Sequence, residues 1–229
     1  MRLVEMPMYG LNLNRRQDRK LRAWGQFRQQ GLKVTRLAAP DAAGMEDARG
    51  WITPGIRACC AAHRLAWREG AKAGAEAVIV FEDDVVLCGD FRQRLEGINL
   101  PEDWEVFYFG CLFGSPGPEL AENGLLRVRH RSWDNHAYAI RLSFARMVSR
   151  RQAVFSRKTR PLHPGEPPAN DTVMADFHSA HSAWSVWPPM AWQTEGLSNT
   201  FDRIRGNYHP DGRQRYQTEA IGHLPWENV

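Results

Sequence analysis

The sequence predicts a three-layer α/β domain with a mainly parallel central sheet and an irregular C-terminal part. Through the first half of the chain, strand-like segments alternate with segments of helical periodicity, which is the pattern of strand–helix–strand units. The stretch "AEAVIVF" at 75–81 is apolar throughout, as expected of a strand that is covered on both faces. A chain of 229 residues can bury the core of one such domain, and we expect a single domain over 1–229.

The first elements form a strand–helix–strand unit. "MYGLNLN" (8–14) has the pattern of a strand that ends in polar residues, and "LKVTRLAA" (32–39) that of a second strand. Between them, 15–31 has apolar residues at near-helical spacing and a glycine stop at Gly31, which predicts a helix. The polar stretch 40–50 is expected to be a loop.

The next helix has the clearest start signals. Thr53 is a candidate N-cap, and Pro54 suits the first helical turn. Gly70 or Gly74 is expected to end the helix, and the buried strand at 75–81 follows. One helical face collects Ile56, Cys59, Cys60, His63 and Trp67.

The second half is less regular. Its expected elements are strands at 104–111, 125–130 and 135–141, a helix at 143–155, a proline-rich loop at 156–170, a short helix at 171–178 and a strand at 183–187. After Pro188 the chain turns polar and irregular, and this tail either closes over a ligand or runs across the surface.

Composition limits which ligands the protein is expected to bind and in which cellular compartment it is expected to act. The formal net charge is +4, and arginine supplies most of the positive charge, which suits phosphate binding but also fits an ordinary basic surface. The four cysteines form no CxxC pair, so we expect reduced thiols in a cytoplasmic protein. The N-terminus has no apolar signal region, and no stretch approaches the roughly 20 apolar residues of a membrane span.

Three consecutive acids, Glu82, Asp83 and Asp84, end the most hydrophobic strand. Ligands of open α/β sheets bind beyond the carboxyl ends of the strands. Paired carboxylates at that place suit Mg²⁺ or Mn²⁺, which in turn can hold a diphosphate, and adjacent carboxylates repel unless a cation neutralises them. The alternative is a solvated strand end with a helix-capping aspartate.

Several segments, taken in order, resemble glycosyltransferase family 25, the group that contains lipooligosaccharide and collagen galactosyltransferases. They are "LNLNRRQDRK", "CCAAHRLAW", "VIVFEDDVVL", "NHAYAIRLSFARMV", "NDTVMADF" and "QTEGLSNT". The resemblance covers residues 11 to about 200. It departs from the family where "WITPGIRACC" replaces the usual "G-x-x-GC".

The resemblance implies a GT-A fold, that of nucleotide-diphospho-sugar transferases, with a nucleotide-sugar donor, most simply a UDP-sugar, and Mn²⁺ or Mg²⁺. Residues 1–112 would form the donor and metal half, and 113–229 the acceptor half. The predicted donor-binding residues are Asn12, Leu13, Asn14, Arg16, Arg19, Arg57, His63 and Asp83. The predicted metal ligands are Glu82, Asp84 and His209, the catalytic residues Asp171 (as base) and Asp83, and the sugar or acceptor pocket His136, Tyr138 and Trp192.

Some of these residues also have purely structural interpretations. His63 lies on an apolar helix face and could be a core histidine with satisfied hydrogen bonds. Arg16 and Arg19 could be a solvated first turn, although basic residues there oppose the helix dipole and so indicate an external anion. Asp171 could be an N-cap alone.

We therefore expect a metal-dependent glycosyltransferase that transfers a sugar to a hydroxyl of a bacterial surface glycan. One alternative acceptor is a hydroxymethylated base in DNA, as for phage-type DNA glycosyltransferases. The alternative outside enzymes is an inactive nucleotide- or nucleic-acid-binding module.

Overall fold

The computed structural model describes residues 2–45, 52–114, 116–155, 169–194, 196–198 and 203–205. Their main sheet has eight strands in the order β2-β1-β3-β8-β5-β9-β7-β6. The bounds are β1 Met8–Asn12, β2 Val34–Ala38, β3 Ala77–Glu82, β5 Val106–Phe113, β6 Glu119–Leu120, β7 Leu126–Val128, β8 Ser132–Arg141 and β9 Ala183–Ser185. Most strands run in one direction, and β8 and β7 run opposite to their neighbours.

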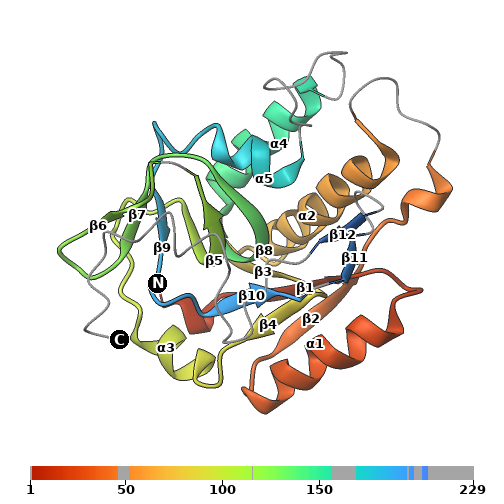
Figure 1. Ribbon diagram of the computed structural model, residues 1–229, viewed down its shortest axis with the longest axis horizontal. Helices are drawn as coiled ribbons and strands as arrows, with labels where there is room; N and C mark the ends of the chain where they lie inside the picture. The colour runs from red at the N-terminus through yellow and green to blue at the C-terminus, as the bar shows by residue number, and fades with distance from the viewer. Residues whose placement is uncertain are drawn as a thin grey trace.

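Helices cover both faces of the sheet, so the predicted three-layer α/β architecture is confirmed (Figure 1). The helices are α1 Gln17–Gln29, α2 Pro54–Lys72, α3 Phe91–Gly97, α4 Leu142–Phe155 and α5 Asn170–Ala175, with short 3-10 turns at Leu3–Glu5 and Ala42–Gly44. In Figure 1, α2, α4 and α5 lie above the sheet, and α1 and α3 lie below it. Within the described residues, no helix has the length and apolar character needed to cross a bilayer.

Each face of the sheet has its own buried cluster, because successive strand residues point to opposite sides. Val78 and Val80 pack with α2 and α4 on one face, whereas Ile79 and Phe81 pack with α1 and α3 on the other. On the first of these faces, α2 packs closely against β3, because a Cβ on Gly70 would lie 2.2 Å from Val78 Cγ1. Glycine therefore lets α2 lie against β3.

The start of α2 follows the predicted signals. Thr53 is the N-cap, its Oγ1 accepts a hydrogen bond from Ile56 N at 3.2 Å, and Pro54 is the first helical residue. The helix ends at Lys72, and Gly74 follows with φ +71°. That left-handed conformation costs glycine little, so Gly74 rather than Gly70 accompanies the helix end.

Several expectations need correction. The chain after Pro188 is not wholly irregular, because β10 (Ala191–Gln193) pairs antiparallel with β4 (Val85–Leu87). A further pair joins β11 (Gly196–Ser198) to β12 (Arg203–Arg205). Helix α3 was not predicted either. Strands of three residues and a helix of two turns are too short to give a periodic signal.

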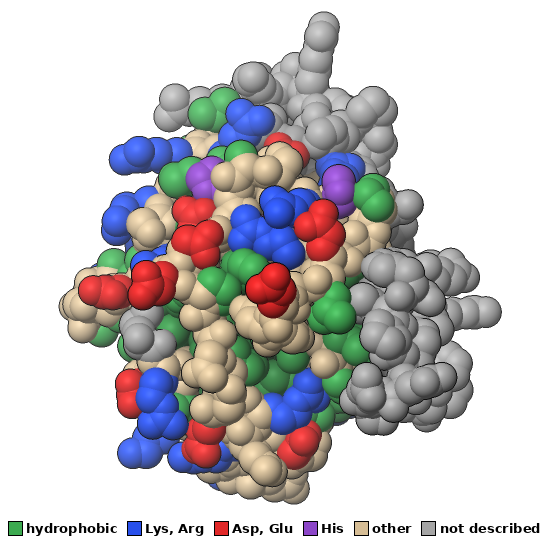
Figure 2. Space-filling view, turned by 90° about the vertical axis from the view of Figure 1, so that its left-hand side faces the viewer, with side chains coloured by type: hydrophobic (Ala, Val, Ile, Leu, Met, Phe, Trp, Pro, Cys, Tyr) green, Lys and Arg blue, Asp and Glu red, His purple; other side chains and the backbone are tan. Residues whose placement is uncertain are grey.

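The β6 edge of the sheet is highly charged. Figure 2, which faces this edge, shows acidic and basic side chains interspersed over the surface. Arg129 on this side pairs with Glu119 of β6 at 2.8 Å. Charged side chains on an edge strand oppose pairing with another chain, so this edge is protected.

Candidate active site

The acidic triplet lies at the carboxyl ends of the neighbouring parallel strands β1 and β3. Glu82 is the last residue of β3, and its Cα partner in the parallel neighbour β1 is Leu11. Asp83 and Asp84 form the turn between β3 and β4. A cleft with about 1010 Å³ of empty space, including the part open to solvent, lies beyond these strand ends and is bounded by β1, α2, the start of α5 and β10.

Arg19 neutralises the two aspartates. Its Nη1 donates to Asp83 Oδ1 and to Asp84 Oδ2, both at 3.1 Å. The Asn12 amide donates to Asp83 Oδ2 at 2.7 Å, and the Gln193 amide donates to Asp84 Oδ2 at 3.2 Å. Arg19, which is only 8% exposed, thus reduces the repulsion expected between the two adjacent carboxylates.

A second network surrounds Glu82. His63 Nε2 lies 3.2 Å from Glu82 Oε1, and His63 Nδ1 lies 2.8 Å from the Tyr138 hydroxyl. Trp67 Nε1 donates to that hydroxyl at 3.2 Å. His63 therefore has partners on both ring nitrogens, as the core-histidine interpretation requires, and it also lines the cleft.

Burial controls the protonation of this network. Burial, and then the charge of Asp84, raise the pKa of Glu82 well above its usual range. Burial lowers the pKa of His63 to about 4, although the Asp171 charge acts in the opposite direction. Burial also raises the pKa of Asp83, with the hydrogen bond from Asn12 opposing it. Because the His63 imidazole is uncharged at neutral pH, its contact with Glu82 is a hydrogen bond and not an ion pair.

Asp171 lies across the cleft from the acidic triplet, in the first turn of α5. Its Oδ1 accepts from Thr172 N at 2.8 Å, and its Oδ2 accepts from Asp134 N at 3.3 Å. The N-cap of α5 is Ala169, so the N-cap interpretation of Asp171 is wrong. The two backbone donors hold its carboxylate at the cleft, where it can reach a ligand.

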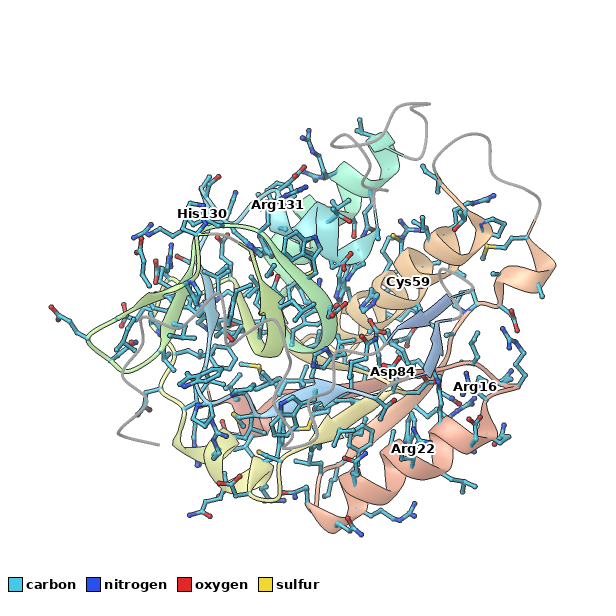
Figure 3. All side chains as sticks on the ribbon, viewed as in Figure 1. Arg16, Arg22, Cys59, Asp84, His130 and Arg131 are labelled. Atoms are coloured by element: carbon cyan, nitrogen blue, oxygen red, sulfur yellow. The ribbon has the colours of Figure 1, made fainter. Side chains whose placement is uncertain are left out.

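Three predicted donor-binding residues are not part of the cleft lining found among the described residues. Arg16, at the start of α1 in Figure 3, pairs with Asp18 at 2.6 Å. Arg57 is exposed in the first turn of α2. Asn14 is exposed and accepts a hydrogen bond from Arg36 at 2.7 Å. Their predicted contacts with the donor remain predictions.

Other residues of the same segments do reach the cleft. Asn12 and Leu13 line it, as does Arg15. Arg15 Nε donates to Asp41 Oδ2 at 2.7 Å, and Asp41 also lines the cleft. Arg15, which precedes α1, and Arg19, in the first turn of that helix, therefore both line the cleft.

The predicted sugar or acceptor residues lie deeper than expected. His136 and Tyr138 are fully buried in β8. The hydroxyl of Tyr138 is the hydrogen-bond partner of His63 Nδ1. Burial lowers the pKa of His136, offset in part by the Ala191 carbonyl. Trp192 lies in β10 opposite Val86 of β4. His209 lies outside the described residues.

Sequence reasoning assigned no role to several polar residues of the cleft, among them Gln193, Asn135 and Cys59. Gln193 contacts Asp84 from more than 100 residues away, and the segment "QTEGLSNT" was the signal that pointed to it. Asn135 begins the segment "NHAYAIR" and lines the cleft beside Asp134, which adopts φ +62°. Cys59, labelled in Figure 3 on α2, also lines the cleft.

The acids fit a hard divalent cation. Asp84 Oδ1 is buried and has no hydrogen-bond partner among the described residues. An unsatisfied buried carboxylate oxygen is costly, and a cation bound by Asp84 and Glu82 would satisfy it with the oxygen ligands that Mg²⁺ and Mn²⁺ prefer. Arg19 leaves this oxygen free to do so.

The architecture and the site together define a class of protein. A mixed α/β fold with a large, mainly parallel sheet, carboxylates at the strand ends and a cleft beyond them is consistent with a glycosyltransferase of the GT-A type. Residues 6–112 match the family described as glycosyltransferase family 25 (LPS biosynthesis protein). This match, with the relatives below, supports the assignment of the chain to glycosyltransferase family 25.

Two relatives extend the match. The human protein named "Inactive glycosyltransferase 25 family member 3" is 34% identical over 188 residues, which is 77% of this chain and 29% of that protein. The Anopheles gambiae protein named "Glycosyltransferase 25 family member" is 25% identical over 235 residues, or 86% of this chain and 39% of that protein. The chain thus spans about a third of the length of these relatives.

Among solved structures, the chain is similar to A197 from STIV. The likeness has a TM-score of 0.43 and 12% identity, and it covers 89% of this chain and 95% of the other. At that level it supports no conclusion, and the fold assignment rests on the sheet and the family.

Proposed function

We propose that the chain is an active, cation-dependent glycosyltransferase that moves a sugar from a UDP-sugar to a hydroxyl group of a bacterial surface glycan. The observation that supports this most is the acidic cleft, in which the buried Asp84 Oδ1 has no partner among the described residues. In this proposal Glu82 and Asp84 hold Mn²⁺ or Mg²⁺. The bound cation would supply positive charge to the departing diphosphate.

The protein's own residues prepare that site. Arg19 offsets the negative charge of Asp83 and Asp84, with which it forms buried ion pairs. Asn12 fixes Asp83 from β1, which suits Asp83 for a contact with the donor. The rim residue Arg15 offers a guanidinium to an incoming phosphate.

Asp171 is the proposed general base. Two backbone N–H groups orient its carboxylate at the cleft. It would take the proton of the acceptor hydroxyl as the new glycosidic bond forms, a role worth about 10²–10⁴-fold in rate.

The alternative is an inactive, nucleotide-binding domain, since the human relative is named inactive. The acids favour activity here. Glu82 keeps a carboxyl group at the base of the cleft although burial raises its pKa, and burial of such a group is costly unless a ligand uses it.

The acceptor is proposed as a glycan because the family description includes LPS biosynthesis. None of the matched relatives supports a DNA acceptor.

The test is release of nucleoside diphosphate from a panel of nucleotide-sugars, with Mn²⁺ and with a chelator, in the presence of candidate glycan acceptors. We expect release from one donor, only with the cation, and its loss in Asp84→Asn. Asp90→Asn is the matched control, because Asp90 is exposed at the start of α3. Donor turnover that is equal in Asp84→Asn and wild type would reject the proposed metal site. The absence of any turnover would favour the inactive binding domain.

A further inference from the structure

A second set of metal-ligand atoms lies in the same cleft. Cys59 and His63 are one turn apart on α2, and Glu82 ends β3 beneath them. One ligand atom from each, namely the thiol sulfur, an imidazole nitrogen and a carboxylate oxygen, lies within 4.8 Å of the others. All three residues line the cleft, and Figure 3 shows Cys59 on α2 above the turn that contains Asp84.

The imidazole is already oriented for coordination. The Tyr138 hydroxyl contacts His63 Nδ1 at 2.8 Å, and Trp67 holds that hydroxyl at 3.2 Å. His63 Nε2 therefore points toward Glu82. Metal-bound histidines commonly have such a partner on the second ring nitrogen, which fixes the ring and its tautomer.

We propose that Cys59, His63 and Glu82 bind a thiophilic divalent cation, most simply Zn²⁺. Thiolate, imidazole and carboxylate are the ligands that Zn²⁺ takes in proteins, and three protein ligands leave a fourth position open toward the cleft. Mg²⁺ and Mn²⁺ prefer oxygen ligands and do not favour coordination by a thiol. The set therefore differs in chemistry from the oxygen set of Glu82 and Asp84.

Small side-chain movements would complete the site. In a tetrahedral zinc site with bonds of about 2.0–2.3 Å, the ligand atoms are roughly 3.3–3.7 Å apart, somewhat closer than the 4.8 Å limit observed here. The low pKa of His63, about 4, keeps its imidazole neutral and ready to coordinate. Burial raises the pKa of the Cys59 thiol, so binding must displace its proton, as coordinating metals do.

One consequence rests on the proposed function. Glu82 belongs to both ligand sets, so Zn²⁺ at this place would compete with the cation that the donor needs. Zinc should then inhibit donor binding rather than support it. The site itself needs no donor and can be tested alone.

The experiment is a Co²⁺ titration of the full chain, reduced and without nucleotide-sugar. We expect a thiolate-to-cobalt charge-transfer absorption that saturates at one Co²⁺ per chain and is displaced by Zn²⁺. Cys59→Ser should abolish it and weaken Zn²⁺ binding by about 100-fold or more, since changes to mere supporting groups already cost about 10–100-fold. The matched control is Cys60→Ser, because Cys60 is the adjacent thiol and does not belong to the cluster.

A band that is absent from the wild type, or that survives Cys59→Ser, would overturn the proposal. A second measurement needs no variant: Zn²⁺ should protect Cys59 from alkylation, mapped by mass spectrometry, and equal labelling with and without Zn²⁺ would count against the site. The two proposals fail separately. Co²⁺ binding without donor turnover would reject the proposed function alone, and donor turnover without a cobalt–thiolate band would reject the zinc site alone.

Discussion

Replacing Arg19 by methionine tests the charge balance of the cleft. Arg19 Nη1 lies 3.1 Å from one oxygen each of Asp83 and Asp84. At an effective dielectric of about 20, each pair gains about 5 kcal/mol of Coulomb energy before the cost of desolvation. Removal of one partner from a buried ion pair typically costs about 3–5 kcal/mol, because the remaining charge has no compensation. We expect Arg19→Met to lower the free energy of unfolding by that amount in urea titrations without added metal.

The structure supplies the control and two rescues. Arg22→Met changes an exposed arginine on the same helix, and it should alter stability by less than about 0.5 kcal/mol. Asp84→Asn in the Arg19→Met background should restore part of the loss, since one of the two charges is removed. Mn²⁺ should restore part as well, because it binds the folded state alone. If Arg19→Met is as stable as Arg22→Met, the proposed role of Arg19 is wrong.

Three further outcomes follow from individual contacts. Asp171→Asn should lower sugar transfer by about 10²–10⁴-fold with little change in the donor Kd, and full activity in transfer assays would remove Asp171 as the base. Burial lowers the pKa of His178 from 6.5 to about 4. Between these two pH values the unfolded chain binds more protons than the folded chain. The contribution of neutral His178 to the free energy of unfolding is therefore fully present above pH 6.5 and falls by about 3 kcal/mol as the pH drops toward 4. Urea titrations across that range should show a smaller loss in His178→Asn, and an unchanged slope would contradict the assignment. A Cβ on Gly110 would lie 1.9 Å from the Ala191 carbonyl oxygen. Gly110→Ala should therefore lower the free energy of unfolding by about 1–3 kcal/mol or more, and with it the melting temperature. Gly89→Ala should leave the melting temperature unchanged, because a Cβ on Gly89 meets no atom within 4 Å.

The fold was predictable where local signals are long and agree with one another. The buried strand before Glu82 and the helix that starts at Thr53 were placed correctly because apolar periodicity and capping chemistry indicate the same elements. The antiparallel direction of β8 and the short strands β4 and β10 were not predictable in this way. Their pairing depends on partners distant in sequence, which periodicity does not record.

Part of the candidate site was likewise predictable from the sequence, and part was not. The position of the acids at the strand ends follows from the general geometry of α/β sheets, and it agrees with the structure. The inward turn of Arg19 onto Asp83 and Asp84 does not follow, because a basic first turn predicts an external anion equally well. The burial of Tyr138 beneath His63 is likewise a result of packing between α2 and β8.

Calorimetric titration of a UDP-sugar into the full chain, with Mn²⁺ and with a chelator, measures whether donor binding needs the cation. We expect wild type to bind the donor in the presence of Mn²⁺ and to lose measurable binding when the cation is removed. Asp84→Asn, with its fold confirmed by circular dichroism, should bind no donor under either condition. Donor binding of equal affinity with and without Mn²⁺, or in Asp84→Asn, would show that Asp84 and its cation do not hold the donor.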